Sequence, residues 1–148
     1  MPQAEPGKRV LVVDDELEVR EALKRILLKE HYEVEAAADG LEARDLVASR
    51  TFNLVITDLI MPGMDGLTLL GHLREACPDT RVMIMTAYGG WDSYLDAMNA
   101  GAFNYVTKPI KKDELLRLVR SALAPEPGEA PDADPEAPAA GSGDAPRG

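Results

Sequence analysis

The chain has 148 residues and a formal net charge of -10 at pH 7. This length suits one domain with a sizeable core, and the acidic balance argues against a broad nucleic-acid interface, which needs a basic face. The single cysteine, Cys77, excludes an intramolecular disulfide and is compatible with a reducing compartment. No apolar run approaches the roughly 20 residues of a membrane-spanning helix, and no signal-peptide pattern precedes the first strand. We therefore expect a soluble, cytoplasmic protein without membrane insertion.

Two strand–helix units are predicted in the first part of the chain. Residues 10–13 are an apolar run without polar alternation, which predicts a strand buried on both faces. The run ends at the acidic pair 14–15, and apolar residues then recur at helical spacing over residues 19–27. Residues 34–38 predict a smaller second strand, and the pattern over residues 43–47 predicts the second helix.

Three more units follow along the chain. Asp58 comes directly after the next strand, the Pro-Gly pair at residues 62–63 then excludes regular structure, and Asp65 is well placed to cap a helix. Thr86 and Lys108 follow the last two strands. The predicted strands and helices of these units are, in chain order, residues 54–56, 69–77, 81–85, 91–102, 103–106 and 115–123.

Composition changes abruptly at residue 125. Residues 125–148 contain no aromatic residue and no Leu, Ile, Val or Met, but hold six prolines and six acids against one base. Such a segment cannot bury enough apolar surface to offset its chain entropy. We therefore predict a flexible N-terminus (1–7), one folded domain (8–124) and a disordered, acidic Pro/Ala-rich tail (125–148).

Five alternating strands and helices predict an α/β fold with a parallel sheet and helices on both faces. Right-handed crossovers and this size favour a doubly wound sheet with strand order 2-1-3-4-5. Ligands of such sheets bind outside the carboxyl ends of the strands, at the switch point between strands one and three. The polar residues at the strand ends are therefore the candidate site.

Those strand ends bring together Asp14, Asp15, Asp58, Thr86 and Lys108. Three carboxylates in one crevice repel one another unless a cation neutralises them, and Mg²⁺ suits a few carboxylates together with a phosphate. Asp58, at the centre, could attack a phosphoryl group to form an acyl phosphate. The Lys108 ammonium and the Thr86 hydroxyl would then bind phosphoryl oxygens. Each residue alone has a simpler interpretation as a helix cap, turn residue or solvated charge, but their convergence from four strand ends favours a site.

Four motifs in this order resemble a known family: residues 12–16 (VVDDE), 57–66 (TDLIMPGMDG), 85–87 (MTA) and 105–109 (YVTKP). From residue 8 to about 124 the chain is similar to the flavodoxin-like receiver domain of two-component response regulators. The resemblance implies that Asp58 accepts phosphate from a histidine kinase or phosphotransfer protein. It further implies a Mg²⁺ site in which Asp15 and Asp58 are direct ligands, Asp14 acts through a water and the Ile60 carbonyl is a further ligand.

The resemblance also implies how the phosphorylated state is signalled. Thr86 and Tyr105 resemble the family's switch pair, and the Lys108–Pro109 bond resembles its cis peptide. Ile60 and Tyr88 stand at positions associated with phosphoryl lifetime. Because neither is expected to align a water for hydrolysis, we expect slow self-dephosphorylation. We expect the signalling surface on the fourth strand, the fourth helix and the fifth strand.

Two departures from the family pattern affect these expectations. Ile110 stands where the family often has Phe, and the segment after residue 124 is not a recognisable DNA-binding or enzymatic output domain. We therefore expect a phosphorylation switch that binds an unknown downstream protein, does not contact nucleic acid directly and is not an enzyme for a separate substrate.

Three other functions are compatible with parts of the sequence. A Mg²⁺-dependent phosphohydrolase of the haloacid dehalogenase type needs an acid/base Asp two residues after the nucleophile, where this chain has Ile60. A flavin-binding flavodoxin binds phosphate after strand one, where residues 14–16 are acidic and would repel it. A phosphorylation-independent scaffold is disfavoured because all five polar positions are present.

Overall fold

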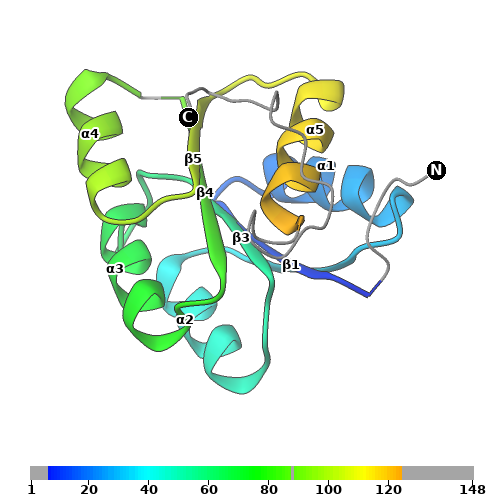
Figure 1. Cartoon of the computed structure of the whole chain (residues 1–148), viewed down its shortest axis with the longest axis horizontal. Helices are drawn as coiled ribbons and strands as arrows, with labels where there is room; N and C mark the ends of the chain where they lie inside the picture. Colours follow the sequence, from blue (N-terminus) through cyan, green and yellow to red (C-terminus); the bar gives the residue numbers. More distant parts are fainter. Residues whose placement is uncertain (1–6, 88, 125–148) are drawn as a thin grey trace.

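A five-stranded parallel sheet forms the centre of the molecule (Figure 1). The computed structural model describes residues 7–87 and 89–124. The strands are β1 (Arg9–Val13), β2 (Glu33–Ala37), β3 (Leu54–Thr57), β4 (Arg81–Thr86) and β5 (Asn104–Thr107). The helices are α1 (Leu17–Lys29), α2 (Gly40–Ser49), α3 (Gly66–Ala76), α4 (Trp91–Asn99) and α5 (Lys112–Leu123).

The strand order is β2-β1-β3-β4-β5, which confirms the predicted doubly wound topology. The register pairs Val13 with Thr57, so the residues that follow β1 and β3 lie side by side at the same edge. Thr57 in turn pairs with Ile84 on β4. The observed strand bounds differ from the predicted ones by one residue in several places, because pairing with neighbouring strands extends or shortens an apolar run.

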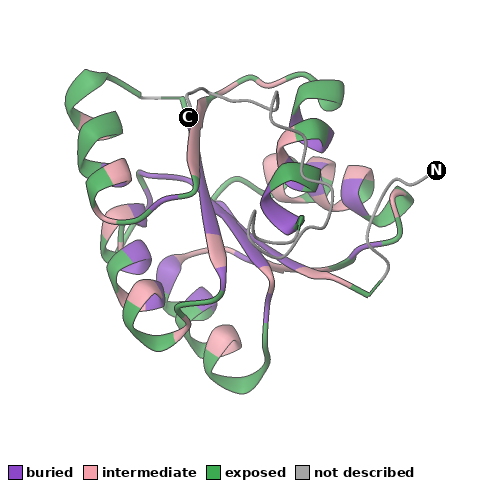
Figure 2. Ribbon diagram, in the orientation of Figure 1, coloured by how far each residue is buried: buried purple, intermediate pink, exposed green. Residues whose placement is uncertain are grey.

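The sheet separates two hydrophobic clusters. Successive side chains of a strand point to opposite faces. Leu11 and Val13 therefore belong to the cluster that includes residues of α2, α3 and α4, whereas Val10 and Val12 belong to the cluster that includes residues of α1 and α5. Figure 1 shows these helices on the two sides of the sheet, and Figure 2 shows that burial is concentrated on the strands and the helix faces turned toward them. Burial on both faces explains why the apolar runs of β1, β3 and β4 lack polar alternation, whereas the edge strand β2 is less buried and carries Glu33 and Glu35 at alternate positions.

Local polar contacts set where the helices begin. Asp65 caps α3 as predicted, because its Oδ1 accepts a hydrogen bond from the backbone N–H of Thr68 at 2.8 Å. Asp39 caps α2 in the same way through Glu42. At the start of α1, the capping position is Glu16, whose side chain makes no cap hydrogen bond.

Several expectations concern residues outside the described ranges. The predicted disordered tail lies there, as does the predicted flexible N-terminus apart from Gly7. Among the helices in residues 7–87 and 89–124, none combines the length and apolar character needed to span a membrane.

Candidate functional site

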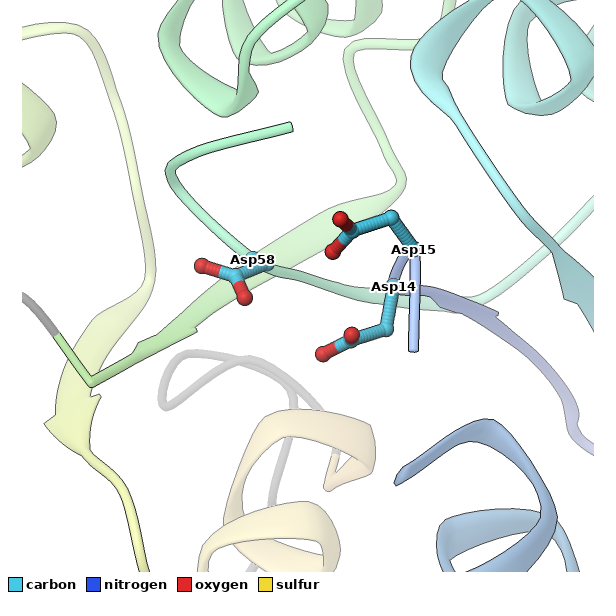
Figure 3. A group of neighbouring side chains, drawn as sticks. All are labelled: Asp14, Asp15 and Asp58. Carbon is cyan, nitrogen blue, oxygen red and sulfur yellow. The ribbon is translucent and has the colours of Figure 1, made fainter. Parts of the chain in front are cut away.

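Three carboxylates gather at the carboxyl edge of the sheet (Figure 3). Asp14 and Asp15 follow β1, and Asp58 follows β3; one oxygen from each lies within 4.8 Å of the others. Asp14 and Asp58 are only 2% and 7% exposed, whereas Asp15 is exposed. The structure thus brings together the three acidic residues that the strand ends predicted.

Backbone hydrogen bonds continue past the strand ends and hold these residues in place. The N–H of Asp58 donates to the carbonyl of Val13 at 3.1 Å, and the N–H of Asp14 donates to the carbonyl of Ala37 at 3.1 Å. The carboxylates also accept local bonds: Asp14 Oδ1 from the Glu16 N–H at 2.9 Å and Asp58 Oδ1 from the Ile60 N–H at 3.2 Å. One oxygen of each buried carboxylate is therefore oriented by its own loop.

Lys108 connects the other oxygens. Its Nζ donates to Asp14 Oδ2 at 2.7 Å and to Asp58 Oδ2 at 2.8 Å, with the lysine side chain 15% exposed. The Lys108 N–H donates to the Thr86 carbonyl at 2.8 Å, and the Lys108–Pro109 bond is cis, as the resemblance implied. Burial lowers the pKa of Lys108, but the hydrogen bonds and charges of Asp14 and Asp58 outweigh it, so the pKa lies above its ordinary value.

The loop after Asp58 folds tightly back toward the strand. Gly63 adopts a positive φ of 80°, which suits glycine. At Gly66, a Cβ atom would overlap the carbonyl oxygen of Asp58 and lie 2.8 Å from Leu59 Cα. The Gly66 N–H donates to the Leu59 carbonyl at 2.8 Å. Sequence reasoning assigned Gly66 no role; its position directly after the capping Asp65 was the available signal.

The donor set fits a hard divalent cation. Octahedral Mg²⁺ holds oxygens at about 2.1 Å, so opposite ligands lie about 4.2 Å apart, and the carboxylate oxygens already lie within 4.8 Å of one another. Three carboxylates and one ammonium carry a formal charge of 1 - 3 = -2, which a divalent cation would balance. The Ile60 carbonyl as a further ligand stays a prediction.

The predicted switch residues lie at the neighbouring strands. Thr86 ends β4 and is fully buried, and Tyr105 on β5 is half-buried. The Tyr105 hydroxyl lies 2.8 Å from Ser93 Oγ on α4, a contact that sequence reasoning missed because no pattern links the two residues. Ile60 is 53% exposed. Tyr88 lies outside the described residues, so its influence on phosphoryl lifetime stays a prediction.

Comparison with known proteins agrees with this geometry. Residues 10–120 match the model of the response regulator receiver domain. The chain therefore belongs to the response regulator receiver domain family. The fold is that of the family's solved members: a CheY-like receiver domain protein from Methanospirillum hungatei superposes with a TM-score of 0.77 at 33% identity, over 79% of this chain and 94% of that one.

Individual relatives are similar over most of this chain. The response regulator protein PilR of Pseudomonas aeruginosa is 39% identical over 84% of this chain, and the response regulator MprA of Mycobacterium sp. (strain KMS) is 39% identical over 88%. The chain spans only 28% of PilR and 56% of MprA. The response regulator protein TrrA of Thermotoga maritima, solved in complex with Mg(2+)-BeF, is 41% identical with a TM-score of 0.72, over 78% of this chain and 99% of that one.

Proposed function

We propose that this receiver domain is a phosphorylation switch whose Asp58 accepts a phosphoryl group from a histidine kinase or phosphotransfer protein. The observation that carries the proposal is the Lys108 ammonium bridging Asp14 and Asp58 at the carboxyl edge of β1 and β3. A salt bridge in this position holds a cation beside the nucleophile before the substrate arrives. Preorganised charge of this kind stabilises phosphoryl transfer more than charge that must be recruited.

The positions of Asp58, Lys108 and Thr86 support the following steps of phosphoryl transfer. An Asp58 carboxylate oxygen attacks phosphorus while the bond from phosphorus to the donor's histidine nitrogen breaks, which yields an acyl phosphate and a neutral imidazole after protonation. Lys108 then exchanges its hydrogen bond with Asp58 for one with a phosphoryl oxygen. Thr86, buried at the end of the adjacent β4, would supply a hydroxyl to another oxygen.

Asp15 and Asp58 would hold Mg²⁺ directly, with Asp14 acting through a water. When bound, the ion would screen the charge of the incoming phosphoryl group. The choice of Mg²⁺ as the ion is supported by the related TrrA, which was solved in complex with Mg(2+)-BeF. The Asp58 nucleophile is oriented by the Ile60 N–H, and the neighbouring Asp14 carboxylate is oriented in the same way by the Glu16 N–H.

The signal would leave through Thr86 and Tyr105. Phosphorylation draws the Thr86 hydroxyl toward the site, and the Tyr105 ring follows, so that α4 and the adjoining strands bind a downstream protein differently. We propose that the domain acts in the cytoplasm and has no separate substrate. No role for direct nucleic-acid binding is proposed for this acidic chain.

The test is labelling with acetyl phosphate as a small donor, followed by intact-mass spectrometry. We expect one added phosphoryl group in Mg²⁺, none for Asp58→Asn, and at least a tenfold slower reaction in excess EDTA. Asp45→Asn, an exposed acid on α2, is the matched control and should react normally. Normal labelling of Asp58→Asn would overturn the proposal.

A further inference from the structure

The first turn of α4 makes a specific contact with Tyr105. Ser93 Oγ lies 2.8 Å from the Tyr105 hydroxyl oxygen. The same serine hydroxyl also contacts both backbone groups of Gly90, at 3.1 Å from its nitrogen and 3.1 Å from its carbonyl oxygen. Ser93 therefore joins the start of α4 to the side chain of β5 that the proposed function assigns to switching.

Either hydroxyl group can be the donor in the Ser93–Tyr105 hydrogen bond. A serine hydroxyl has one hydrogen to donate and two lone pairs to accept with. In one arrangement the Ser93 hydroxyl donates its hydrogen to the Gly90 carbonyl, and the Gly90 N–H donates to one lone pair of the Ser93 oxygen. The remaining lone pair then accepts the hydrogen of the Tyr105 hydroxyl, so that every hydrogen-bonding group of Ser93 is used; in the other arrangement Ser93 donates its hydrogen to Tyr105.

Other contacts hold the Tyr105 ring in the same place. A Cβ atom at Gly89 would lie 2.8 Å from the tyrosine oxygen and 3.1 Å from ring atom Cε1, so the ring rests against a backbone that has no side chain. Tyr94 packs edge-on against Tyr105, with ring centroids 5.6 Å apart. Trp91, 70% exposed, stacks on Tyr94. The position of Tyr105 is thereby connected to an aromatic pair on the surface.

We propose that Ser93 is a positioning residue that latches Tyr105 against α4 and so opposes the phosphorylated state. This inference rests on the proposed function, because it requires Tyr105 to leave α4 when Asp58 is phosphorylated. A ligand shifts an equilibrium only by its differential affinity for the two states. Phosphorylation must therefore break the Ser93–Tyr105 bond, and by reciprocity an absent bond favours binding of the phosphoryl group. Release of Tyr105 also removes the edge contact beneath the Trp91–Tyr94 pair.

The experiment uses beryllofluoride with Mg²⁺ as a phosphoryl analogue, titrated into the full chain. Trp91 is the only tryptophan, so its fluorescence reports on this surface alone. Ser93→Ala removes a neutral hydrogen bond, and we expect the half-saturating beryllofluoride concentration to fall about fivefold. Tyr105→Phe should lower it by a similar factor. The unliganded Ser93→Ala chain should already show part of the fluorescence change.

A double-mutant cycle separates latching from helix capping, because Ser93→Ala also frees the Gly90 N–H. If Ser93 acts through Tyr105, Ser93→Ala has no further effect on affinity in the Tyr105→Phe background. Ser93→Thr, which keeps the hydroxyl, should restore wild-type affinity. An equal effect of Ser93→Ala in both backgrounds, or no effect in the wild type, would overturn the latch.

Failure of the proposed function gives a different result. If beryllofluoride binds neither the wild type nor any variant, or binds Asp58→Asn equally well, the acceptor assignment and the latch both fall. If beryllofluoride binds every chain except Asp58→Asn with the same affinity, the acceptor assignment stands and only the latch falls.

Discussion

Lys108 forms ion pairs with two buried carboxylates, those of Asp14 and Asp58. Its ammonium is mostly buried, which disfavours the charge, yet two carboxylates at 2.7 and 2.8 Å compensate for the lost hydration. Without the lysine, Asp14 and Asp58 would be two buried acids in mutual repulsion. The same residue therefore stabilises the two buried carboxylates and is the group that we propose to bind a phosphoryl oxygen.

The raised pKa of Lys108 leads to a prediction about stability at high pH. A folded-state pKa above the unfolded value of about 10.4 means that the stabilisation is complete below that value and is lost as pH rises through the folded pKa. Urea unfolding in EDTA should show the wild type about 1–3 kcal/mol more stable than Lys108→Met at pH 7, with this difference narrowing as the pH rises above the unfolded pKa of about 10.4. A stability difference between the wild type and Lys108→Met that stays constant as the pH rises would contradict the raised pKa of Lys108.

At the scale of elements, the segment between β3 and α3 sets the position of Asp58. Asp65 caps α3, and Gly66 then passes so close to the Asp58 carbonyl that no side chain fits. The loop thereby ties the first turn of a helix to the end of a central strand. A shift of either element would be transmitted to Asp58, the proposed acceptor.

Two glycines of α3 give a matched pair of substitutions. Gly71 lies inside the helix with open space around its Cα, so Gly71→Ala should stabilise the domain by about 0.5–1 kcal/mol. Gly66→Ala should instead destabilise it by about 1–3 kcal/mol, because backbone atoms must move to admit the methyl group. Urea unfolding measures both, and acetyl phosphate labelling should slow only in Gly66→Ala. Stabilisation by both substitutions would show that the close approach at Gly66 is unimportant.

At the scale of the whole molecule, charge and hydrophobic burial are distributed differently along the chain. The two hydrophobic clusters of the described residues draw on side chains between Val10 and Leu123. Residues 125–148 carry a charge of 1 - 6 = -5, half of the total of -10, and no large aliphatic or aromatic side chain. The two hydrophobic clusters therefore lie outside residues 125–148, which carry half of the net charge.

This separation predicts the effect of removing residues 125–148. We propose that they form a flexible extension, so that deletion should change the free energy of unfolding by less than about 0.5 kcal/mol and leave the acetyl phosphate labelling rate unchanged. Parallel urea unfolding and mass spectrometry of the two chains provide the measurement. A loss above about 1 kcal/mol, or a markedly altered labelling rate, would mean that the segment binds the domain.

The sequence alone determined the architecture, because two-sided burial of the central strands β1, β3 and β4 leaves apolar runs without polar alternation, and helical periodicity follows each strand. Strand ends were readable for the same reason: the first polar residue after an apolar run, such as Asp14 after residues 10–13, marks the edge of the sheet. The gathering of Asp14, Asp15 and Asp58 then followed from topology, since adjacent parallel strands end at one edge. These inferences depend only on local pattern and on general rules of chain connection.

Only the tertiary structure decided which atoms touch. Lys108 bridges Asp14 and Asp58, which precede it in the sequence by 94 and 50 positions. The distances from its ammonium to the two carboxylates depend on how β5 pairs with β4. The contact of Ser93 with Tyr105 has no sequence signature, because a serine in the first turn of a helix is ordinarily explained by capping alone. The close approach of Gly66 to the Asp58 backbone likewise depends on how the start of α3 lies against the end of β3. Such contacts arise from three-dimensional packing, which a periodic pattern does not encode.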